Sequence, residues 1–318
     1  MAPAFDMQVT DTRQPTSTLA GVRGVPQALI NLARPRQWVK NVIVFGPLVF
    51  AHSLFEGNLL GHSIATFASF CLVSSAIYAF NDVLDVENDK QHPTKRFRPL
   101  PLGQINVPLA LMWGALLGVI GLSLAMSVDV ASGLMALAYV ALMVAYSTKL
   151  KHLVILDVFA ISGGFILRAV AGALAIHVII SPWLYVCTML LTLFLGFGKR
   201  YNELAILDDS AALHRRNLED YSPAMLEQMT SILIASTIMA YSLYTFSADS
   251  LPADHSMMLT IPFTLYGIFR YYYLVHKKSL GGAPEQVLLH DRPLLITVVL
   301  WGAVSIGVLY SGGLSLVL

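Results

Sequence analysis

The sequence predicts an all-α membrane protein with nine transmembrane helices. Of its 318 residues, 56% are hydrophobic and only 12% are charged, whereas about 25% charged residues is usual for soluble globular chains. The apolar residues form runs of about 20, the length that an α-helix needs to cross a bilayer core. We therefore expect one polytopic transmembrane domain over residues 34–318, preceded by a disordered cytoplasmic tail over residues 1–33.

Charge placement predicts how these helices are oriented. The apolar runs lie near residues 38–56, 60–81, 106–127, 130–147, 154–176, 181–198, 224–246, 257–275 and 293–316. Every lysine and arginine except Arg168 falls in the N-terminal tail, in the connections after the even-numbered runs, or at the helix ends beside them. Because short loops rich in lysine and arginine stay in the cytoplasm, the pattern predicts a multi-pass protein of the cell inner (plasma) membrane with a cytoplasmic N-terminus and an external C-terminus.

The connection after the second run combines acids and cations. If the helix continues into it, an asparagine and two aspartates recur at four-residue steps on one face, with a third aspartate beside them. Hard oxygen ligands of this kind suit Mg²⁺, and the cations that follow suit phosphate. We interpret the stretch as a site for a metal-bound diphosphate, although a solvated charged loop would also explain its charges. The metal candidates are Asn81, Asp82, Asp85 and Asp89, and the phosphate candidates are Lys95, Arg96 and Arg98.

Two ionisable residues lie inside the fifth apolar run. Asp157 and Arg168 are three helical turns apart, which is too far for them to pair with each other. Ionisable groups within a membrane usually face a cavity and mark a ligand path. Each of the two residues therefore needs another partner, which is either protein or ligand.

The remaining candidates lie at helix ends on the predicted cytoplasmic side. Lys199 and Glu203 are spaced for a pair within one helix, and the cations around them also suit a ligand that faces the metal motif. Lys40 and Asn41 lie deeper in the first run, where a charge is costly, which favours a polar cavity beside them. The full set is Arg36, Lys40 and Asn41 at the first run, Tyr146 and Lys149 after the fourth, and Lys199, Arg200, Glu203 and Arg215 after the sixth.

Together these motifs resemble those of the UbiA-type intramembrane prenyltransferase superfamily, and more closely its decaprenyl-phosphate phosphoribosyltransferase branch. The likeness extends from Arg34 to the last helix. Aromatic prenyltransferases of the superfamily carry a second acidic motif after the sixth run, where this chain has a cationic segment that suits a bare phosphate better than a metal. The matching segments are Asn81-Asp82-x-x-Asp85-x-x-x-Asp89, Tyr146-x-x-Lys149, Arg34 to Asn41, His92 to Pro99 and Gly198 to Tyr201.

The resemblance implies a UbiA-type bundle with a cytoplasm-facing active-site cavity. It also implies transfer of 5-phosphoribosyl from 5-phosphoribosyl-1-diphosphate (PRPP) to decaprenyl (polyprenyl) phosphate, releasing diphosphate, in the synthesis of the cell-wall arabinan (arabinogalactan) precursor. Mg²⁺ would be the cofactor, and membrane lipids and a homotrimer are further expected partners. In this scheme Asp82, Asp85 and Asp157 are catalytic, Lys95, Arg96, Lys149 and Arg168 bind the donor phosphates, and Lys40, Lys199 and Arg200 bind the acceptor phosphate.

Two other functions fit parts of the pattern. One is an aromatic-ring prenyltransferase with a prenyl diphosphate donor, which would need the second carboxylate cluster that the sequence lacks. The other is a transporter of anionic metabolites, which the short external connections without cations disfavour. Nucleic acid is not an expected partner, because the basic residues are divided among separate loops without stacking aromatics.

Overall fold

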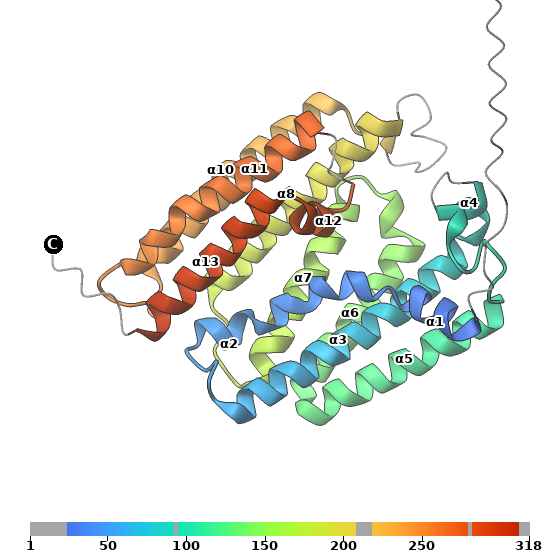
Figure 1. Ribbon diagram of the computed structural model, residues 1–318, viewed down its shortest axis with the longest axis horizontal. Coiled ribbons are helices and arrows are strands. Elements are labelled where there is room, and N and C mark those ends of the chain that lie inside the picture. The colour runs from blue at the N-terminus through green and yellow to red at the C-terminus, as the bar shows by residue number, and fades with distance from the viewer. Residues whose placement is uncertain (1–23, 92–94, 208–217, 279–281, 312–318) are drawn as a thin grey trace, which may run out of the picture.

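The computed structural model describes residues 24–91, 95–207, 218–278 and 282–311, and every regular element in these ranges is helical (Figure 1). Three short segments and one longer one are 3₁₀ helices, labelled η. The elements are α1 (Val25–Ala33), η1 (Pro35–Phe45), α2 (Gly46–Phe50), α3 (Gly57–Leu84), α4 (Val86–Gln91), η2 (Lys95–Phe97), α5 (Val107–Val128), α6 (Val130–Thr148), η3 (Leu150–His152), α7 (Leu156–Ala175), α8 (Pro182–Leu207), α10 (Pro223–Ser247), η6 (Ser256–Thr260), α11 (Ile261–Lys278), α12 (Pro284–His290) and α13 (Arg292–Tyr310).

Seven of the described helices are long and apolar enough to cross a membrane, fewer than the nine that the sequence predicts. The first predicted span folds as η1 followed by α2, because Pro47 lacks the N–H that would extend one helix through Gly46. The eighth, α11, carries three cations that lower its hydropathy, Arg270, Lys277 and Lys278. The seven are α3, α5, α6, α7, α8, α10 and α13.

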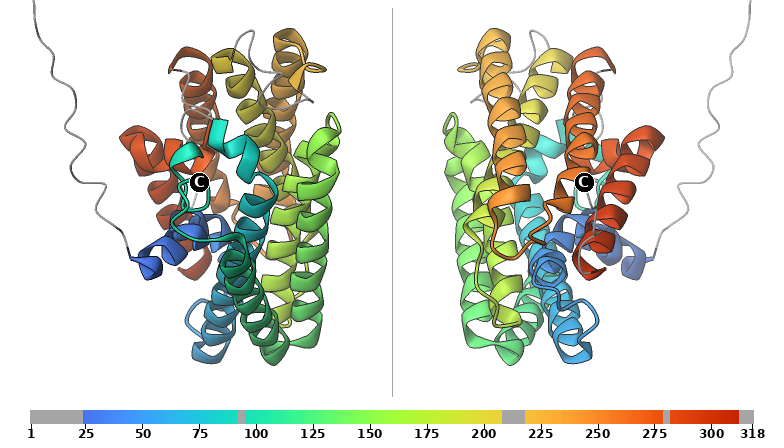
Figure 2. Two further views of the ribbon diagram at one scale, coloured as in Figure 1. Left: turned by 90° about the vertical axis from the view of Figure 1, so that its right-hand side faces the viewer. Right: turned by 90° about the vertical axis from the view of Figure 1, so that its left-hand side faces the viewer.

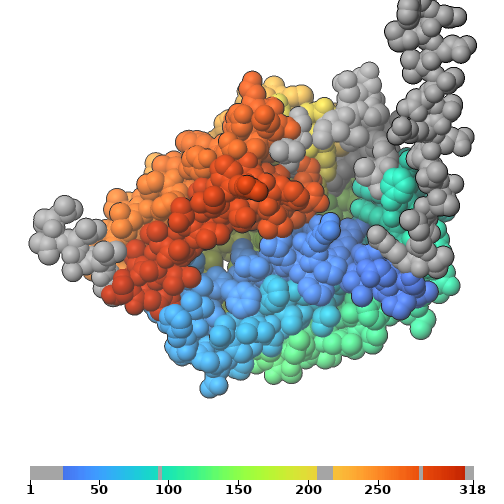
Figure 3. Space-filling view, in the orientation of Figure 1, coloured from blue at the N-terminus to red at the C-terminus, as the bar shows by residue number. Residues whose placement is uncertain are grey.

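The long helices lie side by side in two groups (Figures 1 and 2). In the first group α3 packs on α5, α5 on α6 and α6 on α7, in chain order. The second group consists of α8, α10, α11 and α13, and α8 joins it to the first by packing on α7. Figure 3 shows the seam between the groups on one face, where η1 and α2 lie opposite α12 and α13 and the surface is hollowed.

Part of the predicted N-terminal tail is a helix. Pro26 occupies the first turn of α1, where a missing N–H costs nothing. Ala28 and Leu32 are buried on this helix and pack with Ala79 of α3 and Ala110 of α5. The expectation of disorder is therefore wrong for residues 25–33, and residues 1–23 lie outside the described residues.

The 3₁₀ helix η1 lies against α3 and α7. Its buried residues Asn41 and Val44 face the interior. Gly172 of α7 permits this approach, because a Cβ at that position would overlap the Val44 carbonyl group. The backbone contact places the charged residues of η1 at the seam between the two helix groups.

Candidate active site

The acidic motif lies where α3 ends. The helix stops at Asp85 (φ −100°, ψ 6°) and restarts as α4 at Val86, so it does not continue without interruption through the acids. The break still brings two of the aspartates together. Asp82 and Asp89 are 1% and 2% exposed, and both accept hydrogen bonds from Nη1 of Arg98, at 3.1 and 2.5 Å.

Cations surround these carboxylates. Arg34 forms an ion pair with Asp82, Lys95 Nζ lies 4.0 Å from Asp89 Oδ1, and Lys151 Nζ donates to Asp85 Oδ1 at 2.7 Å. Burial lowers the pKa of the Lys95 ammonium group, and the Asp89 carboxylate only partly offsets this. We call this group the Asp82 cluster; it comprises Asp82, Asp85, Asp89, Arg34, Lys95, Arg98 and Lys151.

The donor chemistry of the Asp82 cluster suits a divalent metal. Its carboxylate oxygens are the hard ligands that Mg²⁺ prefers. The Arg98 guanidinium group already lies between the Asp82 and Asp89 carboxylates as a cation. Within the described ranges, no three histidine, cysteine, aspartate or glutamate side chains are grouped closely enough to hold a metal as they stand. Asn81 is half-buried beside them, and its backbone carbonyl accepts the Asp85 N–H at 3.0 Å.

A second group of charges joins α7 to α8. Arg200 and Asp157 are both buried, and Arg200 Nε lies 2.7 Å from Asp157 Oδ2. Tyr221 donates to the other oxygen of Asp157 at 3.0 Å, and Arg200 also pairs with Glu203. The predicted pair within α8 is confirmed, with Lys199 Nζ 3.8 Å from Glu203 Oε1. We call these five residues the Arg200 cluster.

Lys40 finds a partner at a distant point in the chain. Its Nζ lies 3.4 Å from Oε2 of Glu285, a largely buried residue near the start of α12. Burial alone would raise the pKa of the Glu285 carboxyl group. The Lys40 charge, a hydrogen bond from the backbone N–H of Glu285 itself and one from the Gln37 side chain together outweigh burial, so the pKa is lowered. Lys40 therefore faces a polar interior, where a carboxylate meets it.

Arg168 is held entirely by protein groups that lie inside the first helix group. Its Nε donates to Asn41 Oδ1 at 2.7 Å, its Nη2 to the Tyr139 hydroxyl at 2.9 Å, and its Nη1 to the Gly164 carbonyl at 2.9 Å. Asp157 likewise has protein partners, and the two residues do not pair with each other. These contacts link η1, α6 and α7, and they fix the position of Asn41 next to Lys40.

The other predicted residues lie nearer the surface. Arg36, Arg96 and Lys149 are exposed, Tyr146 is half-buried, and Arg215 lies outside the described residues. Three residues in the clusters were not predicted as site residues: Arg34, Lys151 and Tyr221. Glu285, the partner of Lys40, was not predicted either. Lys151 follows Lys149 by two positions in the same cationic segment, so only its contact with Asp85 distinguishes it.

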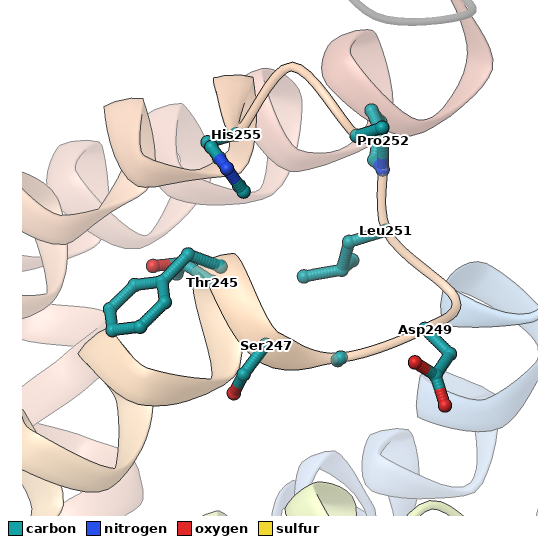
Figure 4. A pocket seen from close by; sticks show the side chains of 9 residues that line it. Thr245, Ser247, Asp249, Leu251, Pro252 and His255 are labelled. Atoms are coloured by element: carbon teal, nitrogen blue, oxygen red, sulfur yellow. The ribbon is translucent and has the colours of Figure 1, made fainter.

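The two clusters form one charged region. Lys95 of the first lies within electrostatic range of Glu203 of the second, and Lys199 lies within range of Lys40 and Tyr146. A separate pocket, lined by Thr245, Ser247, Asp249, Leu251 and neighbouring residues (Figure 4), adjoins the C-terminal end of α10. Tyr221 precedes the opposite end of that helix, so this pocket is remote from the charged region.

Comparisons with known proteins identify relatives of this chain. A model of the UbiA prenyltransferase family matches residues 42–289. A decaprenyl-phosphate phosphoribosyltransferase of Corynebacterium glutamicum is 35% identical over 91% of this chain and 87% of its own length. The Mycobacterium tuberculosis protein of that name is 33% identical over 91% of this chain and 94% of its own.

Solved structures share the fold. A UbiA homolog from Archaeoglobus fulgidus, bound to DMAPP and Mg²⁺, superposes with a TM-score of 0.71 and 19% sequence identity, covering 89% of this chain and 99% of its own. The same homolog bound to Cd²⁺ gives a TM-score of 0.66 at 18% identity over the same shares of the two chains.

Proposed function

The chain belongs to the UbiA prenyltransferase family, and from this premise we propose that it is a multi-pass membrane enzyme that transfers 5-phosphoribosyl from PRPP to a polyprenyl phosphate. Its relatives at 32–35% identity over 91–95% of the chain carry the name decaprenyl-phosphate phosphoribosyltransferase. The reaction releases diphosphate and yields a lipid-linked phosphoribose, which we assign to assembly of a cell-wall arabinan precursor.

The observation that carries this proposal is the chemistry of the Arg200 cluster. A donor diphosphate bridged by metal needs carboxylates, which the Asp82 cluster supplies. A prenyl diphosphate bound by a second metal would need a second carboxylate group. Here the corresponding part of α8 presents Lys199 and Arg200, and the two carboxylates beside them, Asp157 and Glu203, are already paired with these cations. The two cations suit a phosphate that carries no metal.

We assign the metal to Asp82, Asp85, Asp89 and Asn81. When bound, Mg²⁺ would neutralise the diphosphate and favour its departure. Lys95, Arg98 and Lys151 lie beside these carboxylates and hold the donor phosphates. The bond between ribose C1 and the diphosphate oxygen breaks, and diphosphate leaves with the electron pair while an acceptor phosphate oxygen bonds to C1.

The acceptor phosphate lies nearer η1 and α8 in this scheme. Lys40, Lys199 and Arg200 hold it, and its isoprenoid chain extends into the bilayer. Because a phosphate oxygen is already ionised at neutral pH, the reaction needs no strong general base. Orientation and charge stabilisation therefore supply most of the rate.

The contacts of two predicted residues favour supporting roles for them. Arg168 already donates to three protein acceptors, so we assign to it the support of Asn41 and η1 in place of a donor phosphate. Asp157 holds Arg200 in place. We further propose that the protein lies in the plasma membrane, with the active site and the N-terminus on the cytoplasmic side and the C-terminus outside. We also propose that it forms a homotrimer.

The test is a product assay with purified protein in lipid vesicles. PRPP labelled in the ribose, Mg²⁺ and polyprenyl phosphates of several lengths are expected to give a labelled lipid, and EDTA is expected to abolish it. Labelled prenyl diphosphate with an aromatic acceptor serves as the competing reaction. A prenylated aromatic product with no lipid product from PRPP would overturn the proposal.

A further inference from the structure

The proposed acceptor-phosphate site, formed by Lys40, Lys199 and Arg200, already contains carboxylates that offset its positive charge before any ligand binds. Each of its three cations faces a carboxylate: Lys40 faces Glu285, Lys199 faces Glu203, and Arg200 faces Asp157 and Glu203. A lipid phosphate adds negative charge to this buried region, where unpaired charge is costly. One of the carboxylates must therefore leave its cation when the phosphate binds.

Glu285 is the carboxylate that is placed to leave. Asp157 and Glu203 lie on the long helices α7 and α8, and Asp157 is fixed by both Arg200 and Tyr221. Glu285 lies instead near the start of α12, a separate helix of seven residues. Its contact with Lys40 is 3.4 Å long, whereas Asp157 and Glu203 each form a shorter contact with Arg200.

Two buried donor groups lie in the neighbourhood of this carboxylate. The side-chain amide of Asn202 and the hydroxyl of Tyr271 are buried without a hydrogen-bond partner among the described residues. The Tyr271 hydroxyl lies within electrostatic range of Glu285. The Asn202 side chain adjoins Gly282, which precedes Glu285 by three residues. Since buried polar groups are rarely left unpaired, these two donors mark a place that an acceptor oxygen can occupy.

We propose that Glu285 occupies the position of the acceptor phosphate in the ligand-free protein and moves to the Asn202 and Tyr271 donors when a phosphate binds to Lys40. Glu285 thus acts as an internal competitor that sets the affinity for the lipid phosphate. This inference rests on the proposed function, because it takes a polyprenyl phosphate as the ligand of Lys40.

Binding without turnover tests it. Purified wild-type and Glu285→Gln proteins are titrated with a polyprenyl phosphate in the absence of PRPP. Because the neutral amide does not compete for Lys40, Glu285→Gln is expected to bind about tenfold more tightly, on the scale of a hydrogen bond to a charged group. Steady-state assays are expected to show a lower KM for the lipid without a higher kcat. Glu227→Gln, at an exposed position on α10, serves as the control and is expected to match wild type.

A second variant separates competition from a merely structural role. Tyr271→Phe removes only a hydroxyl that has no partner in the described structure, so its thermal stability is expected to match that of wild type. It removes one donor from the second position of Glu285, and lipid phosphate is therefore expected to bind several-fold more weakly. Equal affinities in wild type, Glu285→Gln and Tyr271→Phe would overturn the inference and leave the proposed function standing. Failure of polyprenyl phosphate to bind to any of the three would overturn the proposed function as well.

Discussion

A single arginine organises the acidic motif. Arg98 Nη1 contacts both Asp82 and Asp89, which lie seven positions apart and on different helices. Two buried carboxylates would otherwise repel each other and raise the free energy of the folded state. Arg98 therefore stands between the carboxylates as a cation, and it competes with any metal ion for their oxygens.

Replacing Arg98 is expected to strengthen metal binding in the absence of substrate. In Arg98→Met the two carboxylates lose their shared cation, so Mg²⁺ is expected to raise the melting temperature by more than it does in wild type. The reason is that a ligand stabilises the fold according to its concentration relative to its Kd. Thermal unfolding with and without Mg²⁺ measures this. Arg96→Met, at an exposed position over the Phe97 ring, is the control, and equal Mg²⁺ shifts in all three proteins would contradict the expectation.

Replacement of Lys151 is expected to lower the transferase activity more than replacement of Lys149. The Lys151 ammonium group donates to Asp85 at 2.7 Å and is largely buried, whereas Lys149 is exposed at the end of α6. Loss of a group that orients a metal ligand typically costs about 10- to 100-fold in activity, which is the loss expected for Lys151→Ala. The lipid-product assay on Lys151→Ala and Lys149→Ala measures it. A larger loss in Lys149→Ala would show that the two lysines were assigned the wrong way round.

The element that places Lys40 and Asn41 at the seam between the two helix groups is η1. An eleven-residue 3₁₀ helix is unusual, since runs of more than three or four residues are uncommon. Side-chain hydrogen bonds hold this one in place: Trp38 donates to Ser75 at 3.1 Å, and Asn41 accepts from Arg168 at 2.7 Å. The geometry of η1 therefore depends on α3 and α7 more than on its own backbone.

Substitution of Gly172 tests that dependence. In Gly172→Ala the new Cβ meets the Val44 carbonyl group, a backbone group that cannot rotate away. η1 must then shift, and overpacking of this kind typically costs about 1–3 kcal/mol, so we expect a lower melting temperature and reduced activity. Gly302→Ala on α13 is the matched control, because nothing lies within 4 Å of its added Cβ. A melting temperature for Gly172→Ala equal to that of Gly302→Ala would contradict the expectation.

Helix boundaries show what the sequence could and could not predict. Hydropathy correctly predicted an all-helical membrane bundle, because each apolar run in α3, α5 and α6 signals its environment without help from distant residues. It did not divide the first run into η1 and α2, although Pro47 marks the break, and the 3₁₀ geometry of η1 depends on contact with α3 and α7. Nor could it predict the partners Glu285 and Lys40, which are 245 positions apart and meet only when the two helix groups pack together.

At the scale of the whole molecule, both charged clusters lie at the ends of long helices. The Asp82 cluster lies at the C-terminal end of α3, and the Arg200 cluster lies between the start of α7 and the last turns of α8. The sequence anticipated this gathering, because the even-numbered connections contain the cations. It did not anticipate how completely acids and cations pair with each other, since pairing depends on three-dimensional distances that residue spacing does not encode.

The same asymmetry predicts the orientation in the membrane, and cysteine labelling tests this prediction. In a Cys71→Ser, Cys187→Ser background, a single cysteine is introduced at Asp249, which is exposed after α10, or at Lys278, which is exposed at the end of α11. Because cation-rich connections stay in the cytoplasm and the connection at Asp249 has no cations, an impermeant maleimide is expected to label Asp249→Cys in intact cells. Lys278→Cys is expected to react only after lysis. The reverse pattern would place both charged clusters outside the cell, where cytoplasmic PRPP could not reach them, and would contradict the proposed orientation.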